Sequence, residues 1–367
     1  MKNRASCILV ALLPLLLLLS GCEEPKPQGF GALLGQDEQG FTKVTANRNI
    51  EFPRDHQAHK DFRYEWWYVT ANLENSAGDT FGVQWTQFRI ALAPEEPQNI
   101  EKQEANWNST QIYMAHIAIT MPTLHLTEEK WSRAHPKMAG VTERPFRVYL
   151  DDWQWNSESD GMFPATLSVA ADTFSYELSL SSESAFQLQG DNGYSVKSAD
   201  GRVASHYYSQ PFIDVTGSIQ VEGQTHQVTG QAWIDREWSS RFLLGSQQGW
   251  DWFALRLDTD TSLVVFQLRD NQTGEANYAY GRLMYRDREG ITISADELSL
   301  KVKTYTDLNG HPHPTSWQLD IPTHELFLTI DAINPNAKMP LTVPYWEGPV
   351  HIKGSHEGLG YMELTGY

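Results

Sequence analysis

The chain has 367 residues and a formal net charge of −18, with 40% hydrophobic, 12% aromatic and only 20% charged residues. Thirteen Trp and fifteen Tyr exclude a disordered or coiled-coil chain, because such chains have few aromatic residues or a heptad pattern. A chain this acidic offers no basic surface for phosphates, so nucleic acid is not an expected partner.

The first segment, residues 1–21, is typical of an export signal. A short basic start precedes an apolar run from Ile8 to Leu19, which is too short to span a membrane. The run ends in Leu19-Ser20-Gly21-Cys22, which resembles the lipobox of bacterial lipoproteins. We therefore predict that Cys22 becomes the lipidated N-terminus, and the alternative is an ordinary secretory signal followed by a chance cysteine.

Lipidation would hold the chain on the periplasmic face of a bacterial cell envelope. Glu23, at a position where Asp would resemble an inner-membrane retention signal, favours the outer membrane. Beyond Cys7 in the leader and Cys22 there is no cysteine, so no disulfide, Cys-based metal site or thiol nucleophile is expected. Residues 22–49 are rich in Gly, Pro and polar residues without periodicity, which predicts a flexible tether.

From about residue 50 onward, apolar residues recur with a period of two, which predicts strands. No stretch of helical period is longer than about ten residues. The turn signals between the runs include Asp160-Gly161 and Asn309-Gly310. The predicted strands lie at 64–73, 81–92, 111–120, 146–155, 165–170, 174–180, 214–221, 226–234, 250–257, 262–269, 278–285, 292–301, 316–321, 325–331 and 348–353.

So many short strands exceed the needs of one small sheet. Two antiparallel barrels or sandwiches accommodate them better, and the length also predicts two domains. The natural division is near 230–245, before Gly245-Ser246-Gln247-Gln248-Gly249 interrupts two Trp-rich strands. We therefore predict an all-β chain with domains at 50–240 and 241–367.

The segment Tyr64-Glu65-Trp66-Trp67-Tyr68 places a carboxylate among aromatic residues. In a strand, Glu65 shares one face with Trp67, while Trp66 and Tyr68 take the other. A carboxyl group in apolar surroundings has a raised pKa and can act as an acid near neutrality, so Glu65 is a candidate catalytic residue. The alternative is that Glu65 pairs with an arginine such as Arg63 or Arg89 and only stabilises the fold.

Three histidines are candidates for a site. His56 and His59, together with Asp61, have a spacing found in metal sites, but no third and fourth ligand can be assigned. Loop histidines at a strand entrance are the favoured interpretation, and we expect no metal or other cofactor. His116 shares a face with Met114 and Ala118, so it is either a hydrogen-bonded core residue or part of a ligand-binding wall.

The most specific pattern consists of the segments 230–238 and 249–253, which together hold four Trp and four ionisable residues. Trp side chains form large apolar walls, and carboxyl groups between them are poorly hydrated. Asp235 and Glu237 are therefore candidate catalytic residues. In a regular strand they lie on the opposite face from Arg236. The alternative is a domain-junction core with its ion pairs.

Several motifs together resemble the AttH-like, carotenoid 1,2-hydratase (hydroxyneurosporene synthase) family. The resemblance runs in order from about His56 to Tyr367. It rests on the motifs EWWYVTANL, FGVQWTQFRIAL, MAHIAIT, GQAWIDREWSS, GWDWFALRL, YWEGPVHIKG and GYMELTGY.

The resemblance implies two lipocalin-like β-barrel domains in tandem. It also implies a choice of functions, because biosynthetic members of the family add water across the terminal double bond of an acyclic carotenoid. Other members are exported proteins of unknown activity, and some are associated with ABC transporters.

The chain departs from the family pattern at Arg236. Members commonly have His between the Asp and a following Glu or Asn, whereas this chain has Asp235-Arg236-Glu237-Trp238. A guanidinium group cannot supply a proton to an alkene, and an adjacent cation would keep a carboxyl group ionised. We therefore expect Asp235, Arg236 and Glu237 to form a structural ion-pair cluster at the domain junction.

Three functions remain open. The favoured one is a lipid-anchored envelope protein that binds or hands over an apolar lipid or isoprenoid in a lipocalin-like cavity, with an ABC transporter as a further partner. The alternative is a hydratase or hydrolase that uses Asp235, Glu237 or Glu65, and the third is an envelope interaction protein. The candidate ligand-binding residues are Trp66, Trp67, Trp85, His116, Trp238, Trp250 and Trp252.

Overall fold

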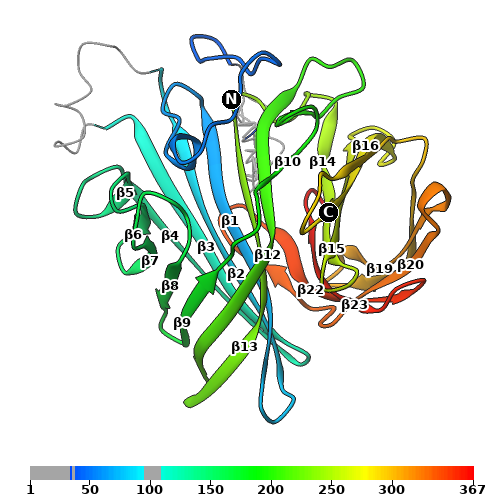
Figure 1. Ribbon diagram of the computed structural model, residues 1–367. Coiled ribbons are helices and arrows are strands. Elements are labelled where there is room, and N and C mark those ends of the chain that lie inside the picture. Colours follow the sequence, from blue (N-terminus) through cyan, green and yellow to red (C-terminus); the bar gives the residue numbers. More distant parts are fainter. Residues whose placement is uncertain (1–33, 35–37, 95–108) are drawn as a thin grey trace, which may run out of the picture.

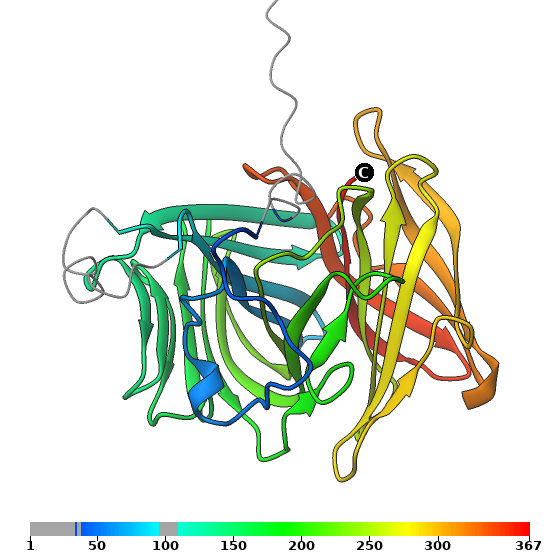
Figure 2. The same ribbon diagram turned by 90° about the horizontal axis from the view of Figure 1, so that it is seen from above.

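Strands dominate the computed structural model, which describes Leu34 and residues 38–94 and 109–367. They form two antiparallel sheets, each curled into a barrel or half-barrel, and the two barrels lie side by side (Figures 1 and 2). The short 3-10 turns are η1 (Arg54–His56) and η2 (Pro322–His324). In the described part of the chain, no helix is both long and apolar enough to cross a membrane.

The first sheet has 13 strands in the order β4-β3-β2-β1-β13-β12-β9-β8-β7-β6-β5, and β10 and β11 also pair with β12. The first strand of this barrel therefore pairs with its last strand. The strands are β1 (Tyr64–Asn75), β2 (Thr80–Ala91), β3 (Gln111–Met121), β4 (Leu124–Arg133), β5 (Ala139–Thr142), β6 (Arg147–Leu150), β7 (Trp153–Ser157), β8 (Ala165–Ala170), β9 (Phe174–Ser181), β10 (Gln187–Leu188), β11 (Tyr194–Val196), β12 (Ala204–Val221) and β13 (Gln224–Ser239).

The second sheet repeats this arrangement with 10 strands in the order β17-β16-β15-β14-β23-β22-β20-β19-β18, and β21 pairs with β22. Its first and last strands, β14 and β23, are again neighbours. The strands are β14 (Gln247–Arg256), β15 (Thr261–Asp270), β16 (Ala276–Tyr285), β17 (Ile291–Ile293), β18 (Ser299–Asp307), β19 (Pro312–Ile321), β20 (Leu326–Ala332), β21 (Lys338–Met339), β22 (Tyr345–Gly354) and β23 (Gly358–Leu364).

Apolar side chains fill the interior of each barrel. Alternate residues of β1 such as Trp67, Val69 and Ala71 join the core of the first barrel, because successive side chains of a strand point to opposite faces. Trp317 and Trp346 lie in the separate core of the second barrel. The all-β prediction with two antiparallel barrels is therefore confirmed.

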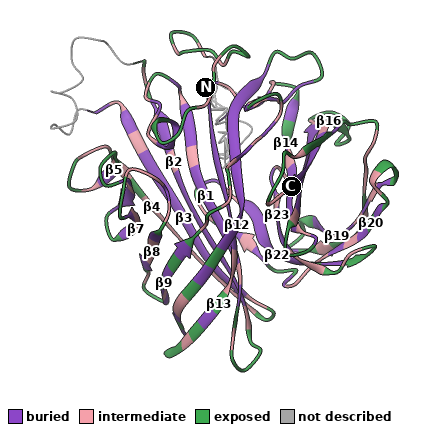
Figure 3. Cartoon of the chain, in the orientation of Figure 1, coloured by how far each residue is buried: buried purple, intermediate pink, exposed green. Residues whose placement is uncertain are grey.

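A third apolar cluster joins the outer faces of the barrels. It combines Tyr68 and Trp233 of the first barrel with Trp252, Phe266 and Tyr361 of the second. Figure 3 shows the consequence, because β1 and the upper part of β12 are buried while the lower ends of β12 and β13 are partly exposed.

Two sequence expectations need correction. The predicted tether at 22–49 extends too far, because Val44 packs against the core of the first barrel and Arg48 forms an ion pair with buried Asp55. The strand predicted at 214–221 begins ten residues earlier, as part of β12. The predicted signal peptide and Cys22 lie outside the described residues.

Candidate functional site

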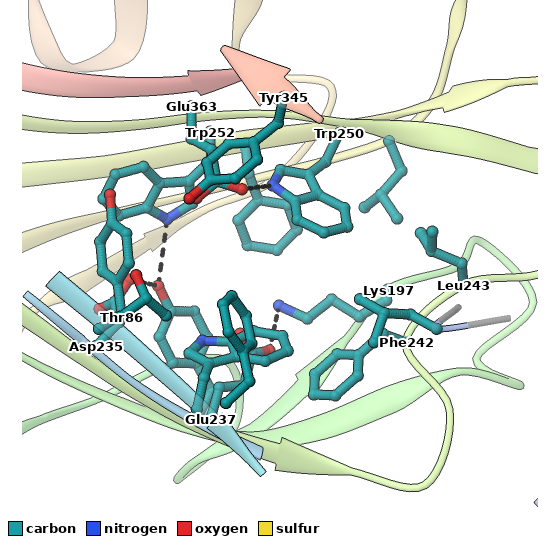
Figure 4. A pocket seen from close by; sticks show the side chains of 17 residues that line it. Thr86, Lys197, Asp235, Glu237, Phe242, Leu243, Trp250, Trp252, Tyr345 and Glu363 are labelled. Carbon is teal, nitrogen blue, oxygen red and sulfur yellow. Dashed lines mark hydrogen bonds and ion pairs between the residues drawn. The ribbon is translucent and has the colours of Figure 1, made fainter. Parts of the chain in front are cut away.

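A pocket that is open to solvent on one side lies between the two barrels rather than inside either one (Figure 4). Aromatic rings form most of its wall. Leu34 also lines the pocket, together with Phe242 and Leu243 of the segment that joins the barrels. The residues lining the pocket are Leu34, Trp66, Tyr68, Thr86, Phe88, Lys197, Tyr207, Asp235, Glu237, Phe242, Leu243, Trp250, Trp252, Phe266, Leu268, Tyr345 and Glu363.

Strand β13 supplies two of the carboxyl groups. Asp235 and Glu237 point outward into the pocket, whereas Ile234 and Trp238 point into the core of the first barrel. The alternation predicted from the sequence is therefore confirmed for this strand. Because the second barrel packs on the outer face, both faces of β13 are buried here.

Asp235 is a buried carboxyl group held by three donors. Tyr207 donates its hydroxyl to Oδ2 at 2.6 Å, Trp233 donates Nε1–H to Oδ1 at 2.8 Å, and Ser209 also donates to Oδ1. No Lys, Arg or His of the described chain forms an ion pair with Asp235. Burial raises the pKa of Asp235 to about 7, although the three hydrogen bonds oppose this change.

Glu237 has a cationic partner. Lys197 Nζ lies 2.8 Å from Glu237 Oε1, and Ser205 also donates a hydrogen bond to that oxygen. The ammonium group lies over the rings of Tyr207 and Phe266 at 4.7 Å and 4.2 Å from their centroids. The two carboxyl groups of β13 are therefore chemically different, one paired and one without a cation.

The second barrel contributes Glu363 from β23, a residue that the sequence analysis missed. It faces the pocket, and its Oε1 accepts a hydrogen bond from Trp250 Nε1 at 2.7 Å. Burial, with smaller effects from the charges of Asp235 and Glu237, raises the pKa of Glu363 to about 8. The sequence signal was a single acid within the apolar motif GYMELTGY, but nothing local indicated which face it takes.

Glu65 is not available as an acid. It is fully buried inside the first barrel and forms ion pairs with Arg89 and Arg236. The backbone N–H of His59 also donates to it at 2.9 Å. The nearby guanidinium groups and His59 hold the pKa of Glu65 well below its ordinary range despite the cost of burial. The alternative of a structural pair with Arg89 is therefore the one observed.

The expected ion-pair cluster of Asp235, Arg236 and Glu237 is wrong. Arg236 points into the first barrel, where its guanidinium group pairs with Glu65 and lies 3.9 Å from the ring centroid of Trp67. It therefore does not reach the two acids of the outer face. The departure from the family pattern at Arg236 leaves the carboxyl groups of the pocket unchanged.

The predicted ligand-binding residues separate into two groups. Trp66, Trp250 and Trp252 line the pocket. The other three Trp residues do not, because their side chains lie in the core of the first barrel, and these are Trp67, Trp85 and Trp238. The expectation of a cavity inside a barrel is thereby replaced by a pocket between barrels.

The histidines take structural positions around the first barrel. His116 is fully buried behind the pocket wall, with Nδ1 3.1 Å from the hydroxyl of Tyr345. His59 bridges Asp55 and Glu65 at 3.1 Å and 3.2 Å. Asp61 is exposed and does not join them. In the described residues, no group of three His, Cys, Asp or Glu is arranged to hold a metal ion.

Comparisons with known proteins agree with this architecture. A family model described as AttH-like matches residues 43–367. A crystal structure from Nitrosomonas europaea with the provisional name AttH is 32% identical, covers 89% of this chain and 99% of its own, and has a TM-score of 0.79. Kievitone hydratase from Nectria haematococca is 13% identical over 89% of this chain and 94% of its own, with a TM-score of 0.64.

At 13% identity, the similarity to kievitone hydratase shows only a shared fold. The barrels of this fold are lipocalin-like. Among curated proteins, none matches the sequence significantly.

Proposed function

The chain belongs to the AttH-like family, and from this premise we propose that its inter-barrel pocket catalyses addition of water to a carbon–carbon double bond of an apolar substrate. The observation that carries the proposal is the pair Asp235 and Glu363. These carboxyl groups come from different barrels, line one apolar pocket and have no cationic partner in the described chain. The name of the fold relative kievitone hydratase points to the same class of reaction.

Hydration of an alkene needs a protonated acid and a group that accepts a proton from water. Glu363, whose pKa is raised to about 8, is the proposed donor of a proton to one carbon. The aromatic wall stabilises the positive charge that develops on the other carbon. A water molecule attacks that carbon, and ionised Asp235 accepts the second proton of the water.

The direct test is incubation of the protein with an acyclic carotenoid in detergent, with mass spectrometry of the extract. The expected product has gained one water molecule. Glu363→Gln and Asp235→Asn should each lower turnover by roughly 10² to 10⁴. Asp214→Asn is the matched control, because Asp214 is exposed on β12 and lies outside the pocket.

Binding without turnover is the second candidate, and the apolar wall of the pocket supports it. A carotenoid that co-purifies or binds to the protein but is recovered unchanged would favour this function and contradict the hydratase. A protein that hands the ligand to an ABC transporter would belong to the same class.

We also propose that the chain is lipid-anchored in the bacterial envelope through Cys22. Leu19-Ser20-Gly21-Cys22 supports this proposal. Two acyl chains would suffice for stable anchoring, and an anchor would keep the pocket close to a source of apolar molecules. Cys22→Ser should abolish labelling with a fatty acid and release the protein from membranes, and a variant that stays labelled would contradict the anchor.

A further inference from the structure

A fully buried glutamate that does not line the pocket lies beside Glu363 on the neighbouring strand. Glu347 of β22 is paired in register with Glu363 of β23, so their side chains lie next to each other on one face of the sheet. Glu347 is 1% exposed, and no Lys, Arg or His of the described chain forms an ion pair with it. Two neighbouring carboxyl groups without a cation are unfavourable when both are ionised, so at least one of them holds a proton near neutrality.

Hydrogen bonds around Glu347 fit this conclusion. Tyr68 donates its hydroxyl to Glu347 Oε1 at 2.6 Å, and Tyr345 lies two residues before Glu347 on the same face of β22. The other oxygen, Oε2, is buried and has no hydrogen-bond partner among the described residues. A buried oxygen without a donor is costly as part of a carboxylate, but it is a suitable position for this proton.

A chain of polar groups leads from this pair to the surface. The hydroxyl of Tyr345 lies 3.1 Å from Nδ1 of His116, and the two rings are stacked with centroids 5.6 Å apart. Nε2 of His116 lies 3.5 Å from Oε2 of Glu129, which is the residue directly opposite on β4. The side chain of Glu129 is 22% exposed, so the chain ends in contact with solvent.

We propose that Tyr345, His116 and Glu129 form a proton path that connects the carboxyl pair Glu347–Glu363 at the pocket with bulk solvent. The proposal rests on the proposed function in one respect, because the path would restore the proton that Glu363 gives to the substrate. It adds positioning residues on β3 and β4, outside the pocket wall.

The path has two states. Between them, one net proton moves from Glu129 to Glu347. In one, Glu129 is protonated and donates to Nε2, Nδ1–H donates to the oxygen of Tyr345, and the Tyr345 hydroxyl donates to ionised Glu347. When each proton moves to the next group of the path, Glu347 gains a proton and Glu129 loses one. His116 stays neutral and exchanges its tautomer, so the atoms and charges balance.

The test uses infrared spectroscopy and needs no substrate. The carbonyl band of the protonated pair is assigned by its loss in Glu363→Gln and Glu347→Gln. After transfer of the full chain into D₂O, this band shifts as the carboxyl proton exchanges. Tyr345→Phe and His116→Phe should slow that shift by about tenfold or more, because each removes a link of the path.

Matched controls separate the path from packing effects. Tyr361→Phe removes another buried hydroxyl at the barrel interface. His125→Phe replaces a different imidazole, which is half-buried and lies in β4. Both should exchange at the wild-type rate. Equal exchange in Tyr345→Phe and the wild type would overturn the path but leave the hydratase untouched. Absence of a band that depends on Glu363 would instead overturn the proposed proton donor.

Discussion

At the scale of single residues, carboxyl groups serve opposite purposes on the two faces of one barrel. Glu65 lies inside, ionised between two guanidinium groups, whereas Asp235 lies outside, without a cation and with a raised pKa. The difference follows from what each carboxyl group meets. A cation within contact distance outweighs the cost of burial, and neutral donors do not.

Arg236→Ala should destabilise the fold and spare the pocket. The variant leaves Glu65 with one of its two guanidinium partners, and breaking a buried ion pair costs about 3–5 kcal/mol. Urea denaturation measures the loss in the free energy of unfolding. Arg144→Ala is the control, because the side chain of Arg144 is 75% exposed and its ion pairs lie at the surface. The urea midpoint of this variant should equal that of the wild type. An unchanged midpoint in Arg236→Ala would contradict the structural role.

Asp235 should make stability fall as the pH rises from about 4 to about 7. Its pKa is about 7 in the folded chain but near its ordinary 3.8 when unfolded. Between these values the folded state binds more protons, so the free energy of unfolding decreases with pH and is level above both. The decrease in the free energy of unfolding that Asp235 causes over this pH range is at most about 4 kcal/mol.

Asp235→Asn removes this titration, and urea denaturation at several pH values measures it. The variant should show a flatter profile than the wild type between these pH values. Glu363→Asp keeps a carboxyl group and serves as the comparison. Profiles of equal slope for Asp235→Asn and the wild type would mean that Asp235 is ionised throughout.

At the scale of elements, the strands between the barrels are buried because one face packs on the core of the first barrel and the other face packs on the second barrel. The first ten residues of β12 are all buried, whereas its end alternates. One face lies on the first barrel's core, and residues such as Tyr207 on the other face meet the second barrel. A strand buried on both faces loses its period-two pattern, which is why the sequence predicted only 214–221.

Gly82→Ala should weaken the contact between β2 and the second barrel. A Cβ atom at Gly82 would lie 2.6 Å from Pro349 Cγ and 2.8 Å from the Tyr361 hydroxyl. The proline ring cannot move aside without shifting β22, and overpacking of this kind costs about 1–3 kcal/mol. Gly245→Ala is the control, because a Cβ there meets open space. Equal urea midpoints for the two variants would contradict this close packing.

At the scale of the whole molecule, the pocket exists only because two barrels meet. Asp235 and Trp66 come from the first barrel, and Trp250, Trp252 and Glu363 come from the second. Neither barrel interior could serve instead, because apolar side chains occupy both. The binding of any ligand in this pocket therefore depends on the relative position of the barrels.

A long-chain isoprenoid should change the Trp fluorescence through the pocket residues alone. Trp250→Phe should reduce the change, because Trp250 lines the pocket. Trp317→Phe should preserve it, because Trp317 lies in the core of the second barrel. Fluorescence titration measures both variants against the wild type. A response lost in Trp317→Phe and kept in Trp250→Phe would place the ligand inside a barrel.

The sequence by itself determined the class of the fold and the face of each strand. Period-two alternation is a local property, so it correctly put Trp67 and Glu65 on one face of β1, and Asp235 and Glu237 on the face of β13 opposite Arg236. The spacing of strands and turns was enough to predict two antiparallel barrels.

Only the tertiary structure decided which faces meet. Glu65 and Arg236 are 171 residues apart in sequence, and their pairing turned a candidate acid into a structural group. Tyr68 and Glu347 are 279 residues apart, and nothing near either one indicated the other. The chemistry of a buried carboxyl group depends on its neighbours in space, and packing of one barrel on the other supplies those neighbours.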